Sequence, residues 1–386
     1  MVYMDYNATT PPTKEIIFLS HRLQSEYWFN PNSVYKQGRE VRKVIDKARE
    51  QCAAAIGAEP EQIFFTSCAS ESNAMAIRYG RYHNERVFNS PFEHTDIIEN
   101  KSSYNIPVDD FYDDLKYVDN TRDLVSIILV NNESGRIIDI HDYADYMHHN
   151  GNHKDFYTGK FTYSRIHSDM SQAFGKIPIN VKDLDVDFAT FSSQKIGSIR
   201  GCSVLYVKSP CAFKKYYEPL IYGHQEQGLR GGTENTVAIA CMGEAMERYN
   251  YNEVFDDVWY HYKQTLTKAF NSIPGAVVLN TDTTTHKFTS NVVQVSFKGI
   301  ESESLVLMCD SQGLCISGGA ACNSHSLEPS NEVKYLCGLH DPDTVNPYGV
   351  VRISYGWNTT TSDIDQTIKI ITQAVTNLRE INGGKQ

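Results

Sequence analysis

Hydrophobic residues recur at intervals of three and four between residues 36 and 57, which is the spacing of a helix that packs on one face. Glycine commonly follows the last residue of a helix because it tolerates left-handed backbone angles, and Gly57 stands at that position. The pattern predicts an amphipathic helix that ends at Gly57. Its apolar positions are Val41, Val44, Ile45, Ala48, Cys52, Ala55 and Ile56.

Short runs of apolar residues follow this helix, and each is succeeded by a polar or glycine-containing turn. Runs without alternation are typical of strands that are buried on both faces, as in a parallel sheet covered by helices. They predict an α/β fold with a mainly parallel sheet. The runs span residues 63–66, 125–130, 186–191 and 204–207.

The pattern changes near residue 251. A long helix, a strand at 292–297, a helix at 302–310, a strand at 350–354 and a closing amphipathic helix are predicted there. A chain of 386 residues also favours more than one domain. We therefore predict a large α/β domain over residues 14–250. A smaller α+β domain would comprise residues 1–13 and 251–386.

A polar stretch at 148–164 interrupts the large domain. It contains His148, His149 and His153 and is rich in residues that form loops. Three histidines could hold a metal ion, but a solvated surface insertion is the favoured interpretation, so no metal site is predicted.

Composition narrows the class of protein. The formal net charge is −11 without a long basic run, so no nucleic-acid partner is expected. No run of 18 apolar residues occurs, and strand-like residues follow Met1 almost at once, so neither a membrane segment nor a leader is expected. A cytoplasmic protein is the resulting prediction.

Nine cysteines are scattered along the chain without a CxxC pair. An odd, unpaired set argues against a disulfide framework and against a zinc ribbon. Most are expected to be inert buried thiols. They are cysteines 52, 68, 202, 211, 241, 309, 315, 322 and 337.

A lysine and an aspartate stand at positions that could serve a cofactor. Lys195 follows an apolar run, and burial lowers the pKa of a lysine toward a value at which it acts as a nucleophile and base. Asp169, on a neighbouring predicted strand, could keep a pyridine nitrogen protonated. Taken alone, the spacing of the pair is a weak signal, and chance or a structural ion pair is the preferred explanation.

Several sequence blocks nevertheless occur together and in one order. The chain resembles the cysteine desulfurases of the class-V aminotransferase superfamily, in the NifS/IscS-like group that carries its catalytic cysteine on a long mobile loop. The resemblance covers nearly the whole chain. Its blocks are residues 5–11, 30–33, 65–73, 93–94, 130–133, 167–195, 228–235, 317–330 and 351–354.

This resemblance implies the fold and the reaction. The fold would be that of the fold-type-I enzymes of pyridoxal 5′-phosphate (PLP), related to aspartate aminotransferase, with a mainly parallel seven-stranded sheet. The enzyme would convert L-cysteine to L-alanine and carry the sulfur as a persulfide on Cys322. The acceptor could belong to iron–sulfur cluster assembly, tRNA thiolation or DNA sulfur modification, and the sequence does not choose among these.

The resemblance also implies residue roles around the cofactor. Lys195 would be the Schiff-base lysine and would move the Cα proton, Asp169 would pair with the ring nitrogen, and Gln172 would bind the phenolic oxygen. His94 would stack on the ring and act as an acid or base. The phosphate would bind at a helix N-terminus, where free N–H groups favour an anion. Its ligands would be Ala69, Ser70, Ser192 and Gln194, with Thr233 contributed by the other subunit of a homodimer.

Substrate binding and sulfur transfer complete the implied site. Arg352 would bind the α-carboxylate of the substrate, because the planar guanidinium suits a carboxylate. Asn132 would assist Arg352 and also bind the cofactor. Cys322 stands in the run Ser317 to Ser324, whose small residues suit a mobile loop. On such a loop, the thiolate of Cys322 could reach the substrate sulfur.

The sequence departs from the family pattern at several positions, of which Gln194 bears most on the cofactor, and two alternatives to the desulfurase interpretation stay open. Gln194 stands where the family has a histidine directly before the lysine, and an amide cannot carry the positive charge that strengthens phosphate binding. The alternatives are another PLP enzyme on the same scaffold, such as a selenocysteine lyase or an aminotransferase, and a non-catalytic relative.

Overall fold

The computed structural model describes residues 1–82, 86–99, 103–105, 123–150, 153–154, 161–162, 164–319 and 328–383. The chain divides into two compact units. The larger unit comprises Pro11–Leu129 and Ile138–Tyr251, and the smaller unit comprises Met1–Thr10, Val130–Ile137 and Asn252–Gln386. Within the described residues, no helix combines the length and the apolar character needed to cross a membrane.

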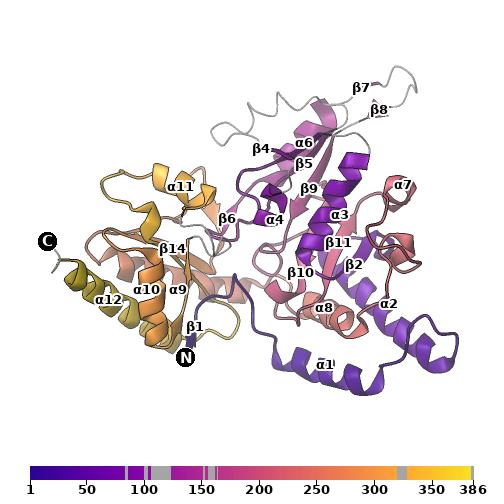
Figure 1. Ribbon diagram of the computed structural model, residues 1–386, viewed down its shortest axis with the longest axis horizontal. Coiled ribbons are helices and arrows are strands. Elements are labelled where there is room, and N and C mark those ends of the chain that lie inside the picture. Colours follow the sequence, from indigo (N-terminus) through magenta and orange to yellow (C-terminus); the bar gives the residue numbers. More distant parts are fainter. Residues whose placement is uncertain are drawn as a thin grey trace. The chain divides into compact units, whose positions relative to one another are not determined.

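A seven-stranded sheet forms the centre of the larger unit (Figure 1). Its strand order is β2-β11-β10-β9-β5-β3-β4. The strands are β2 (Ile63–Thr66), β3 (Arg86–Asn89), β4 (Ser103–Asn105), β5 (Asp123–Ser126), β9 (Arg165–Asp169), β10 (Phe188–Ser192) and β11 (Ser203–Val207).

Strand direction in this sheet decides where loops converge. β11 is antiparallel to both of its neighbours, β10 and β2, so β2 and β10 run the same way. The pairs β10·β9, β9·β5, β5·β3 and β3·β4 are all parallel. The carboxyl ends of every strand except β11 therefore lie on one edge, and the predicted mainly parallel seven-stranded sheet is confirmed.

Helices cover this sheet, and their packing explains the continuous apolar runs. β2, β5, β10 and β11 are buried at every position, as strands covered on both faces are. α3 packs on β10 and β11, and α2 packs on α8. The helices are α1 (Lys14–Glu26), α2 (Lys36–Ile56), α3 (Ala69–Tyr82), α4 (Thr95–Ile98), α6 (Ile140–Asn150), α7 (Pro210–Tyr216) and α8 (Thr236–Arg248), with short 3₁₀ turns η1 (Pro60–Gln62), η3 (Ser193–Lys195) and η4 (Glu226–Gly228).

The predicted helix at 36–57 is confirmed as α2. Gly57 adopts φ 72°, a left-handed angle that ends the helix, and its N–H bonds back to Ala53 and Ala54. Its apolar face meets α8 closely, because a Cβ added to Gly243 would lie only 2.7 Å from the Cα of Ala48. Glycine is thus required at this crossing.

The predicted strand at 125–130 is only partly correct. β5 ends at Ser126, although the N–H groups of Ile127 and Leu129 still bond to His167 and Asp169 of β9, at 3.0 and 3.2 Å. The chain then enters the smaller unit at Val130. The apolar run reflects burial, which continues through Val130, whereas the regular hydrogen-bond ladder of the strand ends at Ser126.

The smaller unit is built around a four-stranded sheet of order β12-β14-β17-β16. β14 and β17 have the bounds that the sequence predicted, and α9, α10 and α12 pack with them around one core that includes Phe270, Phe297 and Tyr355. The strands are β1 (Val2–Tyr3), β6 (Arg136–Ile137), β12 (Ala276–Val278), β13 (Lys287–Phe288), β14 (Val292–Phe297), β15 (Leu314–Cys315), β16 (Ser317–Gly318) and β17 (Val350–Ser354). The helices are α9 (Glu253–Asn271), α10 (Ser302–Ser311), α11 (Asn331–Gly338), η5 (Pro347–Gly349) and α12 (Thr361–Gly383).

The polar stretch at 148–164 is more ordered than predicted where the structure describes it. His148 lies in α6, and its ring nitrogens lie 2.6 Å from Asp185 and 3.1 Å from Asp187. β7 (His153–Lys154) pairs with β8 (Phe161–Thr162). The solvated-loop interpretation was wrong for His148 because two carboxylates distant in sequence hold it. Residues 151–152, 155–160 and 163 lie outside the described residues.

Candidate active site

The carboxyl edge of the large sheet collects the predicted cofactor residues. Ser70 follows β2, His94 follows β3, Asp169 ends β9 and Lys195 follows β10. All four strands point their carboxyl ends to this edge, where ligands of open α/β sheets bind. Residues far apart in sequence thus reach one place within the larger unit.

Asp169 is a buried carboxylate whose hydrogen-bond donors carry no charge. Its Oδ2 accepts from the Asn73 amide at 3.0 Å and its Oδ1 from the Ser171 N–H at 2.9 Å. The residue is 5% exposed, and no lysine or arginine pairs with it among the described residues. A buried anion without a counter-ion suits a protonated pyridine nitrogen.

Neighbouring polar atoms also lack partners. The hydroxyls of Ser168 and Ser171 and the amide oxygen of Asn73 are buried and make no hydrogen bond in the described part of the chain. Buried polar groups are normally satisfied, and such a group points to a missing ligand. The surroundings of Asp169 therefore fit a polar cofactor.

Lys195 ends the 3₁₀ turn η3, directly after β10. The turn is fixed by Ser193, whose hydroxyl donates to the carbonyl of Ile199 at 2.7 Å. Ser192 is buried at the end of β10, while Gln194 and Lys195 are partly exposed. Thr190 of β10 lies beside Asp169 of β9 in the sheet. Lys195 therefore comes shortly after the residue that pairs with Asp169.

Gln172 is buried in the turn that follows β9 and accepts a hydrogen bond from Lys176 through its side-chain oxygen. Its amide N–H₂ is the group that would donate to the phenolic oxygen of the cofactor.

The N-terminus of α3 offers an anion site. The first helical bonds are donated by Glu71 and Ser72 to Cys68, and the N–H groups of Ala69 and Ser70 have no acceptor among the described residues. Such free N–H groups attract phosphate. Arg230 binds Glu71 in the same turn, with Nε 2.9 Å from Oε1. This ion pair connects the glycine-rich segment 228–235 to the N-terminus of α3.

His94 stands before α4 and pairs with a carboxylate two residues later. Its Nδ1 lies 3.0 Å from Oδ1 of Asp96, and the Asn73 amide reaches the same carboxylate at 3.3 Å. Sequence reasoning assigned no role to Asp96 or Asn73. The adjacency of Asp96 to His94 was the available signal.

Burial shifts the pKa of two further titratable groups near this edge toward the uncharged form. Burial raises the pKa of Glu93 well above its usual range, and burial lowers the pKa of His167 to about 4. His167 is held by Ser126 at 2.8 Å and Thr190 at 3.2 Å inside the sheet.

Arg352 lies on β17 of the smaller unit and is 3% exposed. Its Nη2 binds Asp5 at 2.7 Å and the hydroxyl of Ser317 at 3.1 Å, and its Nη1 donates to the backbone carbonyl of Asn132 at 3.0 Å. Its Nε has no partner among the described residues. Three hydrogen bonds therefore fix the orientation of the guanidinium, and its Nε–H donates to none of the described residues.

The segment that contains Asn132 is held by side chains of α11 and of the residue before it. Ser330 caps α11 and donates to Glu133 at 2.6 Å. Arg136 binds Glu332 in a buried pair with Nη2 2.7 Å from Oε2. These residues hold the 130–137 segment against α11 within the smaller unit. Cys322 itself lies outside the described residues.

The other cysteines are free where the structure describes them. Burial raises the pKa of five thiols, which keeps them protonated and unreactive. These are Cys52, Cys202, Cys241, Cys309 and Cys337.

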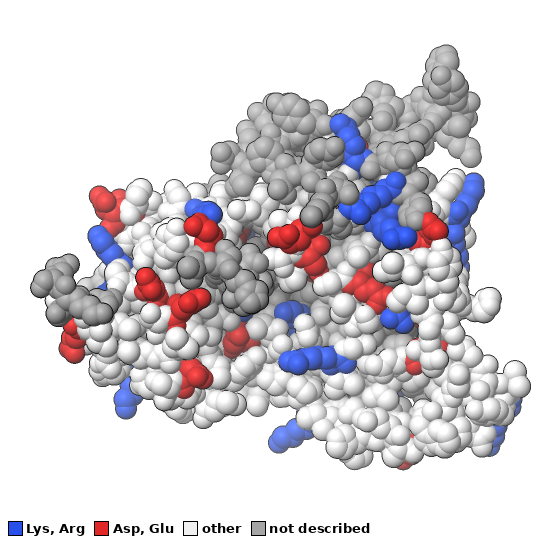
Figure 2. All heavy atoms as spheres, in the orientation of Figure 1, with Lys and Arg blue, Asp and Glu red and all other residues white. Residues whose placement is uncertain are grey.

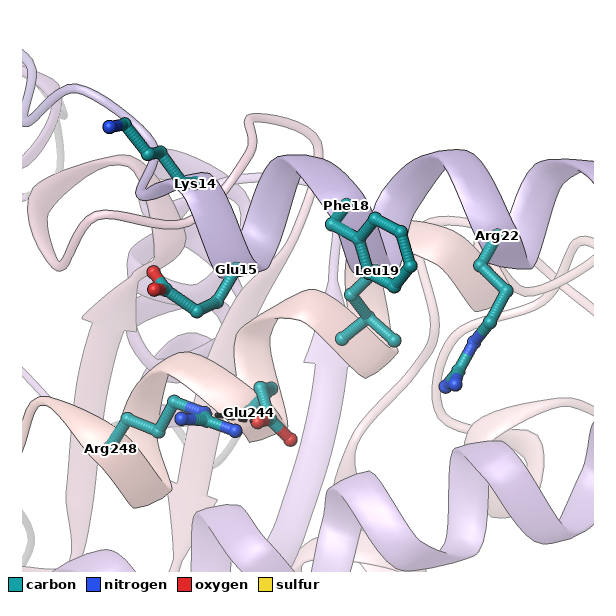
Figure 3. A pocket seen from close by; sticks show the side chains of 7 residues that line it. All are labelled: Lys14, Glu15, Phe18, Leu19, Arg22, Glu244 and Arg248. Carbon is teal, nitrogen blue, oxygen red and sulfur yellow. Dashed lines mark hydrogen bonds and ion pairs between the residues drawn. The ribbon is translucent and has the colours of Figure 1, made fainter.

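A groove of about 440 Å³ lies between α1 and α8 (Figure 3). Phe18 and Leu19 of α1 line it together with Glu244 and Arg248, which pair with each other one turn apart on α8. It contains none of the predicted site residues. On the face drawn in Figure 2, acidic and basic side chains are interspersed among uncharged ones.

The fold and the site together define a PLP enzyme of fold type I. The aminotransferase class-V family matches residues 2–367, and the chain belongs to this family, whose members depend on PLP. The donor set at the sheet edge, with Asp169, Lys195 and the α3 N-terminus, fits that cofactor.

Relatives named cysteine desulfurase match over nearly the whole chain. It is 32% identical to a cysteine desulfurase IscS of Methanosarcina thermophila, over 99% of this chain and 93% of the relative. It is also 32% identical to the cysteine desulfurase IscS of Dictyoglomus turgidum, over 100% and 97%.

Solved structures of the same fold include a NifS-like protein from Rickettsia africae, with TM-score 0.81, 25% identity and 97% and 99% of the two chains covered. A structure described as SspA in complex with cysteine has TM-score 0.69, 26% identity and coverage of 92% and 98%.

Proposed function

We propose that the protein is a PLP-dependent cysteine desulfurase, which converts L-cysteine to L-alanine and takes the sulfur onto Cys322. The observation that carries the proposal is the assembly of Asp169, Lys195, His94 and the α3 N-terminus on one sheet edge. The full-length relatives named cysteine desulfurase support the same reaction.

Each residue has a task that follows from its surroundings. When bound, PLP supplies an electron sink for the bonds to the substrate Cα. Asp169 keeps the ring nitrogen protonated, because its buried carboxylate has no other counter-ion among the described residues. Lys195 holds the cofactor covalently and carries the proton taken from Cα. His94 exchanges protons beside the ring.

The phosphate is bound by the N–H groups of Ala69 and Ser70 together with Ser192 and Gln194. These groups are neutral, so the dipole of α3 provides most of the attraction. Gln194 donates a hydrogen bond without a positive charge, and a weaker hold on the cofactor follows.

Arg352 binds the α-carboxylate of the substrate. Its Nε–H and one Nη1 proton have no acceptor among the described residues, and Asp5, Ser317 and Asn132 fix the plane of the guanidinium. Charge-assisted hydrogen bonds from a buried arginine are strong and directional. Asn132 orients Arg352 through its backbone carbonyl, and its side-chain amide would assist in binding the substrate.

Sulfur transfer needs a second thiol. The Cys322 thiolate forms an S–S bond to the substrate sulfur while the C–S bond breaks, and the electron pair of that bond stays with carbon. Carbon then takes up a proton and alanine leaves, so the substrate is reduced at carbon while sulfur is carried as a persulfide. The buried cysteines are protonated and cannot replace Cys322.

A homodimer completes the site in this proposal. Thr233 is exposed in the larger unit, in the block that Arg230 ties to α3. Large apolar side chains are exposed on the same unit, including Phe18 at 71%, Trp28 at 70% and Tyr222 at 71%. Apolar surface of this extent favours burial against another chain. Thr233 would then bind the phosphate in the other subunit.

The sulfur acceptor is a thiol or a thiolation system that receives the persulfide, and iron–sulfur cluster assembly is the acceptor pathway we favour because the relatives carry the name IscS. We place the enzyme in the cytoplasm, where reducing conditions keep an acceptor thiol and Cys322 competent.

Absorption spectroscopy of the purified protein tests the function. The protein should show a visible cofactor band that changes on addition of L-cysteine, with alanine and protein-bound sulfur formed in equal amounts in the first turnover. Lys195→Ala should lose the band. A wild-type protein that binds PLP but forms no alanine from L-cysteine would refute the proposed activity.

A further inference from the structure

The backbone on both sides of Thr233 is fixed within the larger unit. Before it, Gly232 adopts φ 100°, a left-handed angle that favours glycine, and its N–H donates to the side chain of Gln225 at 3.0 Å. After it, Asn235 caps α8 by accepting from the N–H of Ala238 at 3.2 Å. Thr233 itself is exposed. Its hydroxyl is therefore carried at the surface by a backbone of defined conformation.

Glu234, the next residue, is buried, and its side chain is 3% exposed. Its Oε1 accepts from Nη2 of Arg42 at 2.7 Å, and its Oε2 accepts from the Asn32 amide at 3.1 Å. The same Nη2 also donates to Oδ1 of Asn32 at 2.7 Å, so the three side chains close a ring of hydrogen bonds. Charge-assisted bonds of this kind are strong, and they fix the residue that follows Thr233.

Arg42 lies on α2, which also holds the start of this segment. Arg49 comes seven residues later on α2 and therefore lies on the same face of the helix. It forms a bidentate pair with Glu226, at 2.6 and 2.9 Å. Two arginines of one helix thus bind the two carboxylates that flank residues 227–233. Because both carboxylates are buried, movement of the segment away from α2 would leave buried charges unpaired.

The segment between these anchors has unfavourable backbone angles. Glu226 and Gln227 have φ of 45° and 60°, in the left-handed region that residues other than glycine rarely adopt. Such angles persist where surrounding contacts impose them, and they cluster at binding sites. Here the contacts are the pair of Arg49 with Glu226 and the hydrogen bond from Lys214 to Gln227. Strain held in place immediately before Thr233 indicates that the position of this residue matters.

We propose that Arg42 and Asn32 are positioning residues that act through Glu234 to hold Thr233 for the cofactor phosphate in the other subunit. The proposal rests on the proposed function, because it needs the homodimer in which Thr233 reaches that phosphate. A hydroxyl on a fixed backbone loses less conformational freedom on binding than one on a mobile loop, so the phosphate is bound more tightly. Helix α2 of each subunit therefore controls how firmly the opposite site holds its cofactor.

The test compares Arg42→Met with Lys43→Met in the holoenzyme. Lys43 is an exposed neighbour on α2 that pairs with Glu40, so the control removes a positive charge from the same helix. The readout is the rate at which the visible cofactor band is lost during dialysis, and it needs no turnover. Loss of one hydrogen bond to a charged group should speed this release about tenfold, and we expect that change for Arg42→Met and for Thr233→Ala. Lys43→Met should stay within about twofold of the wild type.

Mixed dimers separate a positioning role from a loss of stability. Heterodimers of one Lys195→Ala and one Arg42→Met subunit are purified with two different affinity tags. The Lys195→Ala site has no visible band, so the band reports the other site, whose Thr233 comes from the subunit with an intact Arg42. That site should retain the cofactor as the wild type does. If it lost the cofactor as fast as the Arg42→Met homodimer, Arg42 would act on its own subunit and the proposal would be overturned.

A second variant guards against misfolding. Arg42→Met leaves the Glu234 carboxylate buried without its cation, so Arg42→Met/Glu234→Gln removes both charges. The bond to α2 is still absent in this variant, and cofactor loss should stay about tenfold faster although the urea midpoint returns toward that of the wild type. Recovery of cofactor retention together with stability would contradict the proposal.

Heterodimers of Lys195→Ala and Thr233→Ala distinguish the two levels of the argument. If these heterodimers have no site that retains the cofactor as the wild type does, the shared site of the proposed function is wrong, and this proposal falls with it. If they have such a site and the heterodimers with Arg42→Met do not, only the role of Arg42 is wrong.

Discussion

Replacing Arg352 by lysine separates substrate binding from cofactor chemistry. Lysine keeps the positive charge next to Asp5, so the smaller unit should stay folded. It lacks the planar fork, however, and its single ammonium cannot serve Asp5, Ser317 and Asn132 and still present fixed donors to a carboxylate.

The size of the loss follows from the hydrogen-bond count. Arg352 uses three N–H groups on its protein partners and has two others, Nε–H and one on Nη1, for the substrate. A hydrogen bond to a charged group contributes about 1.5–3 kcal/mol. Loss of two such bonds, partly offset by the lysine ammonium, gives about 3 kcal/mol, or about 10²-fold in kcat/KM at about 1.4 kcal/mol per tenfold.

The assay measures initial rates with L-cysteine and with cysteamine, which lacks the carboxylate. Arg352→Lys should lower kcat/KM for L-cysteine about 10²-fold, mainly through KM, and leave the slow reaction of cysteamine unchanged. Arg379→Lys, a matched change on α12 of the same unit, should affect neither. If Arg352→Lys kept kcat/KM for L-cysteine within threefold of the wild type, the carboxylate would bind elsewhere.

Three further predictions concern the cofactor, the dimer and the scaffold. Gln194→His should slow the loss of PLP during dialysis, because a cationic donor strengthens phosphate binding; equal or faster loss would count against the role of Gln194. Mixed Lys195→Ala and Thr233→Ala subunits should regain activity above either parent, since both lesions fall in one site and leave the other intact; no gain after exchange would reject shared sites. Arg49→Met should lower the free energy of unfolding by about 3–5 kcal/mol in urea titrations. The reason is that the side chain of Glu226, which is 2% exposed, loses its bidentate partner. A change below about 1 kcal/mol would contradict this.

Much of the scaffold was predictable from the sequence because hydrophobic spacing reports burial directly. α2, β2, β14 and β17 lie where the periodicity placed them. The end of β5 was not predictable, since Ile127 to Val130 are as apolar as the strand itself although the regular ladder stops at Ser126. Burial can be inferred from composition, whereas the point at which a chain leaves a sheet depends on its partners.

The site shows the same division. Asp169 and Lys195 could be named because motifs fix their order along the chain. Contacts across long separations could not be found this way. Asp5 and Arg352 are 347 positions apart and meet at 2.7 Å. Asp96 looked like an ordinary acidic residue in the first turn of a helix, and only the distance to His94 distinguishes it.

If Cys322 accepts the sulfur, Cys322→Ser should bind the cofactor and L-cysteine but form no persulfide. The variant and the wild type are each given one equivalent of L-cysteine per site, and alanine, the visible spectrum and the mass of the peptide containing residue 322 are followed. We expect the variant to keep its cofactor band and to shift it with L-cysteine, but to release no alanine and to carry no persulfide. The wild-type persulfide should map to Cys322. Alanine release by Cys322→Ser at the wild-type rate, or a wild-type persulfide on Cys315 or Cys309, would contradict it.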